Sequence, residues 1–184
     1  MKRLGCSAAV LCSLAVTACA TSRDSVVDAE VPDPVALGEA RAELRDVRHA
    51  IQATATLVEG ADSLRVRIEA AGLPHGAYAV HLHAVGRCDG PGFESAGPHW
   101  NPTGQQHGKD NPQGMHKGDL PNLLVGIDGQ GIMEYTILDG RLSDGPRRLL
   151  DADGATLVVH ARPDDYRTDP SGNSGARIAC GRVG

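Results

Sequence analysis

Apolar and polar residues alternate with a period of two along several short stretches of the chain. In residues 64–70, Leu, Val, Ile and Ala are interleaved with Arg and Glu, which predicts a strand with one buried face. The same alternation predicts strands over 53–58, 78–84, 133–137 and 157–161. Because Gly- and Asp-containing turns accompany several of these stretches, the pattern favours an all-β sandwich or barrel.

The first apolar stretch fits two patterns. Five of its residues fall at helical spacing, which alone predicts a helix: Leu37, Ala40, Leu44, Val47 and Ile51. Ala42 and Leu44 also permit a strand followed by a tight turn, as the β-rich context favours. The pattern leaves helix and strand open over residues 37–51.

Two long segments, 85–122 and 162–179, have no period and are rich in Gly, Pro, Asn and Asp. Ordered loops of that length in a compact domain are usually functional. The chain has 184 residues with 23 Gly and 11 Pro, which favours one domain with many turns and disfavours a helix bundle. Only 3% of residues are aromatic, the formal net charge is −5 and no basic stripe occurs, so nucleic-acid binding is not expected.

The N-terminus has the form of an export signal. Met1-Lys2-Arg3 precedes an uncharged run over 4–18, which is too short to span a membrane and fits a secretory signal. The run ends in Val16-Thr17-Ala18-Cys19, which resembles the lipobox of bacterial lipoproteins. That resemblance implies cleavage before Cys19 and lipidation of its thiol; an ordinary signal peptide cut at a nearby Ala is the alternative.

These features predict a signal peptide (1–18), a flexible tether (19–38) and a folded domain (39–184). We expect an exported protein of the cell envelope or periplasm, anchored to a membrane by its lipid. Only Cys88 and Cys180 then remain, and in an oxidising compartment we expect them to pair, with two free thiols as the alternative. Their bridge would close a loop of about 93 residues, worth about 4.6 kcal/mol in chain entropy.

Histidines gather in and beside the two loops. His81 and His83 stand two apart in a predicted strand, so both point to one face, and His160 ends another strand. Four further candidate ligands lie within the first loop: His99, His107, His116 and Asp119. Imidazole suits copper and zinc, and three His with one carboxylate can close a tetrahedral zinc site. His49 and His75 are expected to be ordinary surface or core residues.

Several motifs, together with the spacings of 8, 9 and 3 residues between the four ligands of the first loop, carry a specific resemblance. The motifs are Tyr78-Ala-Val-His-Leu-His-Ala, Gly86-Arg-Cys88, Ser95-Ala-Gly-Pro-His99-Trp-Asn-Pro, His107-Gly, His116-Lys-Gly-Asp119-Leu and Gly172-Asn-Ser-Gly-Ala-Arg177-Ile-Ala-Cys180-Gly. From about Ala40 to its end, the chain resembles the copper–zinc superoxide dismutase family. The resemblance implies a Greek-key β-sandwich or barrel of about eight antiparallel strands, with two long functional loops.

The resemblance also implies one copper and one zinc ion per subunit. The copper ligands would be His81, His83, His99 and His160. The zinc ligands would be His99, His107, His116 and Asp119. Asp164 would link the imidazoles of His81 and His107 from outside the metal sites, and such partners fix ring orientation.

Two residues would act on the substrate. Arg177 would hold superoxide beside copper, and His99, which bridges the two metals, would release copper on reduction and supply a proton. The resemblance implies a disulfide between Cys88 and Cys180, in agreement with the cysteine count. We therefore expect a superoxide dismutase that serves antioxidant defence. The alternative is a non-catalytic dismutase-like module that binds zinc or copper. The sequence does not distinguish a monomer from a homodimer.

Overall fold

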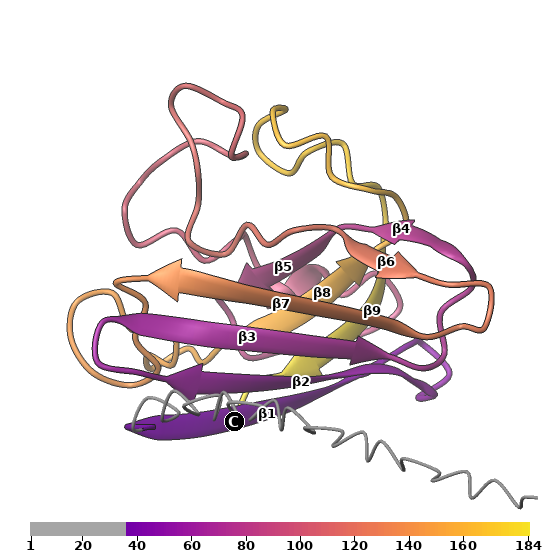
Figure 1. Cartoon of the computed structure of the whole chain (residues 1–184), viewed down its shortest axis with the longest axis horizontal. Helices are drawn as coiled ribbons and strands as arrows, with labels where there is room; N and C mark the ends of the chain where they lie inside the picture. The colour runs from indigo at the N-terminus through magenta and orange to yellow at the C-terminus, as the bar shows by residue number, and fades with distance from the viewer. Residues whose placement is uncertain (1–35) are drawn as a thin grey trace, which may run out of the picture. The chain divides into compact units, whose positions relative to one another are not determined.

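The computed structural model describes residues 36–184, which form short strands and one turn of 3-10 helix (Figure 1). The strands are β1 (Gly38–Arg45), β2 (Ile51–Glu59), β3 (Ser63–Ala70), β4 (Gly76–Tyr78), β5 (Val80–His83), β6 (Leu123–Val125), β7 (Gly131–Leu138), β8 (Thr156–His160) and β9 (Arg177–Arg182). The 3-10 turn is η1 (Glu94–Ala96). The expected signal peptide, the lipidated Cys19 and nearly all of the tether lie outside the described residues and stay predictions.

The strands form one curled antiparallel barrel. Seven of them make a sheet in the order β5, β8, β9, β1, β2, β3 and β7, and β4 pairs with β6 in a second sheet. Only Ala79 separates β4 from β5, and β6 lies against β7, so the small sheet closes most of the gap between the two edge strands. The predicted all-β barrel of antiparallel strands is confirmed. No helix in the described part of the chain has the length and apolar character that crossing a membrane requires.

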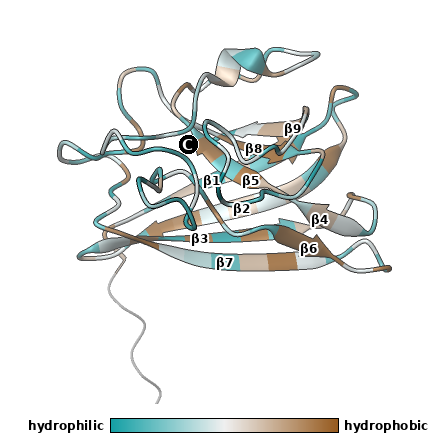
Figure 2. Ribbon diagram, turned by 90° about the horizontal axis from the view of Figure 1, so that it is seen from above, coloured by the Kyte–Doolittle hydropathy of each residue, from teal (hydrophilic) through white to brown (hydrophobic). Residues whose placement is uncertain are grey.

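Alternating residues of the strands build the barrel core, as Figure 2 shows by hydropathy. In β3, Leu64, Val66 and Ile68 are buried while Arg65 and Arg67 between them are not. β5 and β8 differ, because every residue of both strands is buried. One face of these two strands packs in the barrel, and the long loops cover the other.

The segment 37–51 is a strand and a turn, not a helix. Ala40, Ala42 and Leu44 of β1 point into the core. Three of the apolar residues at helical spacing are instead exposed: Leu37, Val47 and Ile51. The turn is built on Asp46, whose Oδ1 accepts hydrogen bonds from the backbone N–H groups of Arg48 and Ala50. The segment forms a strand because the period of two, and not the helical period, matches the positions that are buried.

Two long loops lie together at one side of the barrel (Figure 1). The first connects β5 to β6 over residues 84–122, and the second connects β8 to β9 over 161–176. A disulfide joins Cys88 of the first loop to Cys180 of β9, with 5.7 Å between their Cα atoms, which confirms the predicted pair. The two loops therefore cover the side of the barrel that carries the predicted ligands, and the disulfide joins the first loop to β9.

Candidate metal centre

The edge of β5 brings distant ligands together. His81 and His83 alternate with Val80 and Leu82, which belong to the barrel core, so both imidazoles lie on the face that the loops cover. The first loop pairs with this edge: the N–H of Trp100 donates to the carbonyl of Leu82 at 2.8 Å. Isolated bridges place His83 opposite His99 and His81 opposite Asp119.

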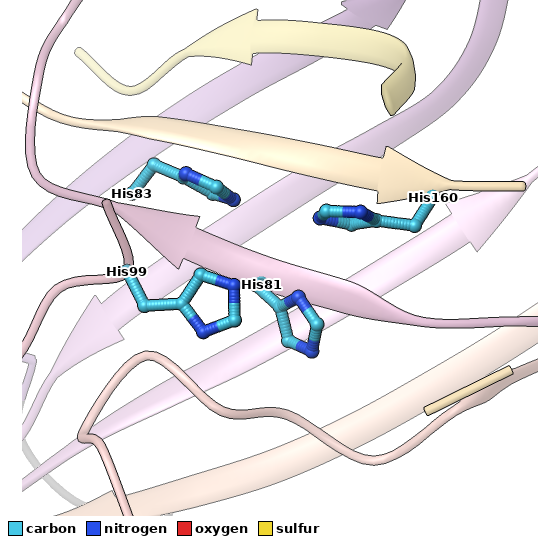
Figure 3. Close-up of side chains that lie close together, drawn as sticks. All are labelled: His81, His83, His99 and His160. Atoms are coloured by element: carbon cyan, nitrogen blue, oxygen red, sulfur yellow. The ribbon is translucent and has the colours of Figure 1, made fainter. Parts of the chain in front are cut away.

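Four buried histidines form the first cluster, drawn in Figure 3: His81, His83, His99 and His160. One ring nitrogen from each lies within 4.8 Å of the others. Four of their nitrogens are buried without a hydrogen-bond partner: His81 Nδ1, His83 Nε2, His99 Nε2 and His160 Nε2. Unpaired buried polar atoms are costly, and converging imidazole nitrogens suit copper or zinc, so these residues fit a metal ion.

The second nitrogen of each ring fixes the tautomer of the imidazole. His83 Nδ1 lies 2.9 Å from the carbonyl of Gly97 and His160 Nδ1 lies 3.3 Å from that of Gly175, so each N–H donates outward. The inner nitrogens then carry lone pairs. Burial lowers the pKa of His81 to about 3, of His83 to about 2 and of His160 to about 4, because the buried cation loses its hydration. The cluster therefore stays neutral at pH 7.

A carboxylate organises the second cluster. Asp119 Oδ1 lies 2.9 Å from His99 Nδ1, 3.0 Å from His107 Nδ1 and 3.1 Å from His116 Nδ1. The other oxygen, Oδ2, accepts the N–H groups of Gly108 and His116. Despite burial, which acts in the opposite direction, hydrogen bonds from the three rings hold the pKa of Asp119 well below its usual range. Three imidazoles and one carboxylate match the donor set of a closed zinc site.

His99 belongs to both clusters. Its Nδ1 faces Asp119, whereas its Nε2 is the unpartnered nitrogen of the first cluster. Its ring centroid lies 4.1 Å from that of His81 and 5.4 Å from that of His116. The ligand atoms of His81, His99, His107 and Asp119 also lie within 4.8 Å of one another, so the two clusters are contiguous.

Asp164 links the clusters from outside. Its Oδ2 accepts from His81 Nε2 at 2.8 Å, and its Oδ1 accepts from His107 Nε2 at 3.0 Å. Burial acts to raise the pKa of Asp164, but these bonds outweigh it and hold the pKa well below its usual range. Burial likewise acts against charging His107, yet its interactions with Asp119 and Asp164 raise the pKa of His107 to about 9.

Arg177 lies at the mouth of the site. It lines a cleft of about 680 Å³ together with His99, His116 and His160. Its Nη1 donates to the carbonyl of Phe93 and its Nη2 to that of Gly97, both at 2.8 Å. No ion pair described within residues 36–184 includes Arg177, although Glu94 attracts its charge from farther away, and the guanidinium can meet an anion in the cleft. Burial lowers its pKa from the ordinary value.

Every ligand and partner residue predicted on the folded domain lies at this centre, whereas His49 and His75 lie elsewhere. Three residues that contact Asp164 were not predicted from the sequence: Asn122 and Tyr166, which form hydrogen bonds with it, and Gly172, which packs against its carboxylate. Two of them carried a signal in the sequence. Asn122 follows the predicted ligand Asp119 by three positions, and Gly172 is the first residue of a motif that carries the family resemblance. The sequence carries no signal for Tyr166, because its role depends on a backbone conformation that local residue types do not reveal.

The comparison with known families identifies the family to which the chain belongs. Residues 51–183 match the family model of copper/zinc superoxide dismutase. The chain belongs to the copper/zinc superoxide dismutase family. Membership supports binding of copper and zinc by the histidine clusters.

Some proteins similar to this chain are named superoxide dismutase, and others are named dismutase-like. Superoxide dismutase (Cu-Zn) 2 of Aquifex aeolicus is 41% identical over 149 residues, which are 79% of this chain and 86% of that protein. Superoxide dismutase-like protein YojM of Bacillus subtilis is 46% identical over 124 residues, 66% of this chain and 63% of that protein. A crystal structure of a dismutase-like protein from Bacillus subtilis matches with a TM-score of 0.73 at 38% identity, covering 77% of this chain and 96% of that one.

Proposed function

We propose that this protein is a superoxide dismutase. The observation that carries the proposal is the set of four buried, unpartnered imidazole nitrogens, contiguous with a three-histidine, one-carboxylate cluster and open to a cleft beside Arg177. The copper ligands are His81, His83, His99 and His160, and the zinc ligands are His99, His107, His116 and Asp119. His99 would belong to both ligand sets, with one copper and one zinc ion per subunit.

The reaction converts two superoxide anions and two protons into dioxygen and hydrogen peroxide. A copper ion held by the four-histidine cluster would supply one-electron redox chemistry. The protein binds the anion through the Arg177 guanidinium, which its two carbonyl acceptors orient within the cleft. When its Nε2 is not bound to the metal, His99 would take up a proton there and pass it to the reduced substrate, while Asp119 keeps its Nδ1 side in place.

Attraction of the substrate must be local. Superoxide is an anion, yet the whole chain has a formal net charge of −5. Exposed charges are screened beyond about 8–10 Å at physiological salt. Arg177 forms no ion pair among the described residues and lines the cleft, so its guanidinium brings positive charge to the place where the substrate would bind.

The site of action follows from the N-terminal sequence. We propose that the protein is exported and anchored in the cell envelope through lipid on Cys19. The lipobox-like run before Cys19 supports this assignment, as does the Cys88–Cys180 disulfide, since such bonds persist in oxidising compartments. An envelope enzyme would remove superoxide outside the cytoplasm.

The test is dismutation by the purified protein loaded with both metals, measured with and without cyanide while copper and zinc contents are determined. Fast, cyanide-sensitive turnover supports the proposal. Both metals bound without turnover would overturn it and leave a metal-binding module, in keeping with the relatives named dismutase-like. His160→Ala provides the matched variant, because this residue belongs to the copper set alone: we expect loss of copper and activity with zinc retained.

A further inference from the structure

Tyr166 of the second loop contacts three separate segments around the zinc cluster. Its backbone N–H donates to Asp164 Oδ1 at 2.6 Å, and its phenol oxygen accepts the backbone N–H of Asn122 at 2.8 Å. Its carbonyl accepts the N–H of Asp110 at 3.0 Å, and the Lys109 ammonium lies 4.3 Å from its ring centroid. The backbone and side chain of this one residue thus join the second loop to two parts of the first loop, one at residues 109–110 and one just before β6.

The backbone of Tyr166 is held in an unusual conformation. Its φ is 62°, in the left-handed region that a bulky aromatic residue rarely adopts. Such conformations persist only where the surroundings over-determine them, and they concentrate at functional sites. The carbonyl of Tyr166 packs directly on Gly108, where a Cβ atom would lie only 2.2 Å from it. Gly108 in turn donates its N–H to the ligand Asp119.

Asn122 completes a clamp on Asp164. Its Oδ1 accepts the N–H of Asp164 at 2.8 Å, and its Nδ2 donates to the carbonyl of Asp164 at 3.1 Å. The phenol oxygen of Tyr166 accepts the backbone N–H of Asn122 and so holds Asn122 in place. Asn122 in turn holds the backbone of Asp164. The Asp164 carboxylate then meets His107 Nε2, and this bond orients the His107 ring toward Asp119.

We propose that Tyr166 is a positioning residue of the zinc site, which keeps Asp164, and through it the His107 imidazole, in the orientation that zinc binding requires. The proposal rests on the zinc assignment made above. The physical reason is preorganisation. Without the hydrogen bond to the phenol, the second loop relaxes in the metal-free protein, and zinc binding must order it again, which weakens the zinc affinity.

The experiment measures zinc affinity of the metal-free full chain by competition with a chromophoric chelator. Tyr166→Phe removes the phenol oxygen and leaves the ring, the backbone bonds and the ring's contact with Lys109. We expect its zinc Kd to rise about tenfold, at the lower end of what loss of an outer partner of a metal ligand costs. With cobalt(II) as the probe in place of zinc, we expect a changed visible absorption, because the ligand geometry is less well fixed.

Tyr78→Phe is the matched control. The Tyr78 hydroxyl donates to the carbonyl of Pro74 at 2.9 Å, so the same chemical change breaks a similar bond in a residue of β4 that packs in the barrel core. We expect it to lower Tm in the metal-free and zinc-bound protein equally and to leave zinc Kd unchanged. If Tyr166→Phe behaves in the same way, the positioning role is overturned while the proposed function stands. If the unmodified protein binds no zinc, both the inference and the zinc assignment fail.

Discussion

Replacement of Gly172 by Ala probes how closely the second loop must approach the linking carboxylate. Gly172 has a φ of +63°, and a Cβ atom there would lie 1.9 Å from Asp164 Oδ1 and 2.7 Å from His107 Nε2. Ordinary contact needs about 3.4 Å, so the carboxylate must move by about 1.5 Å. The bonds of 2.8 and 3.0 Å that it accepts from His81 and His107 do not survive such a shift.

The magnitude follows from these two bonds. Hydrogen bonds to charged groups contribute about 1.5–3 kcal/mol each, so losing both costs about 3–6 kcal/mol, and the left-handed backbone adds about 1–2 kcal/mol for Ala. Domains of this size unfold with about 5–15 kcal/mol, and 1 kcal/mol shifts Tm by about 2–4 °C. We expect Gly172→Ala to lower the Tm of the metal-free protein by about 8 °C or more and to weaken zinc binding about 10–100-fold.

Gly104→Ala separates the clash from the backbone strain. Gly104 has nearly the same φ, +66°, but a Cβ atom there meets nothing within 4 Å. Calorimetry of the metal-free proteins and zinc competition give the two quantities for both variants. We expect Gly104→Ala to lose only the strain energy and to keep its zinc affinity. Equal losses in the two variants would refute the reasoning, because strain alone would then explain Gly172.

Two further predictions concern charge. Arg177→Ala should retain both metals, since Arg177 donates only to carbonyls, and lower the dismutation rate about tenfold or more; an unchanged rate with full metal content would contradict its substrate role. The metal-free protein should lose stability as pH falls from about 6.5 toward 4, because His81, His83 and His160 have lowered pKa values when folded but ordinary ones when unfolded. Each contributes about 1.4 kcal/mol per pH unit in this window. A Tm of the metal-free protein that stays flat from pH 7 to 5 would exclude that linkage.

The candidate ligands were predictable because their signals are local, whereas Asp164 and Arg177 came from the family resemblance. His81 and His83 stand two apart, which in a strand means one face whatever the barrel around them. Asp119 lies three residues after His116, and the spacing from His99 onward is specific to the family pattern. The roles that follow from these positions stay predictions until metals and turnover are measured; the structure shows that the residues meet.

Other features depend on contacts that no local pattern contains. The apolar residues at helical spacing over 37–51 do not share one buried face. Ala40 and Leu44 are buried in a strand, whereas Val47 is exposed in the turn that follows. The clamp around Asp164 depends on Asn122 and Tyr166, which are 44 residues apart and meet only after both loops have folded. Such residues become visible only in the assembled structure.

The disulfide acts on the geometry of the site as well as on stability. Gly97 lies in the loop that the Cys88–Cys180 disulfide joins to β9. Its carbonyl accepts hydrogen bonds from the imidazole Nδ1–H of His83 and from Nη2 of Arg177. That one peptide group sets the tautomer that turns a bare nitrogen of His83 toward the four-histidine cluster, and it also sets the place of the guanidinium in the cleft. Because both placements depend on one carbonyl, movement of this loop would disturb the four-histidine cluster and the position of the Arg177 guanidinium together.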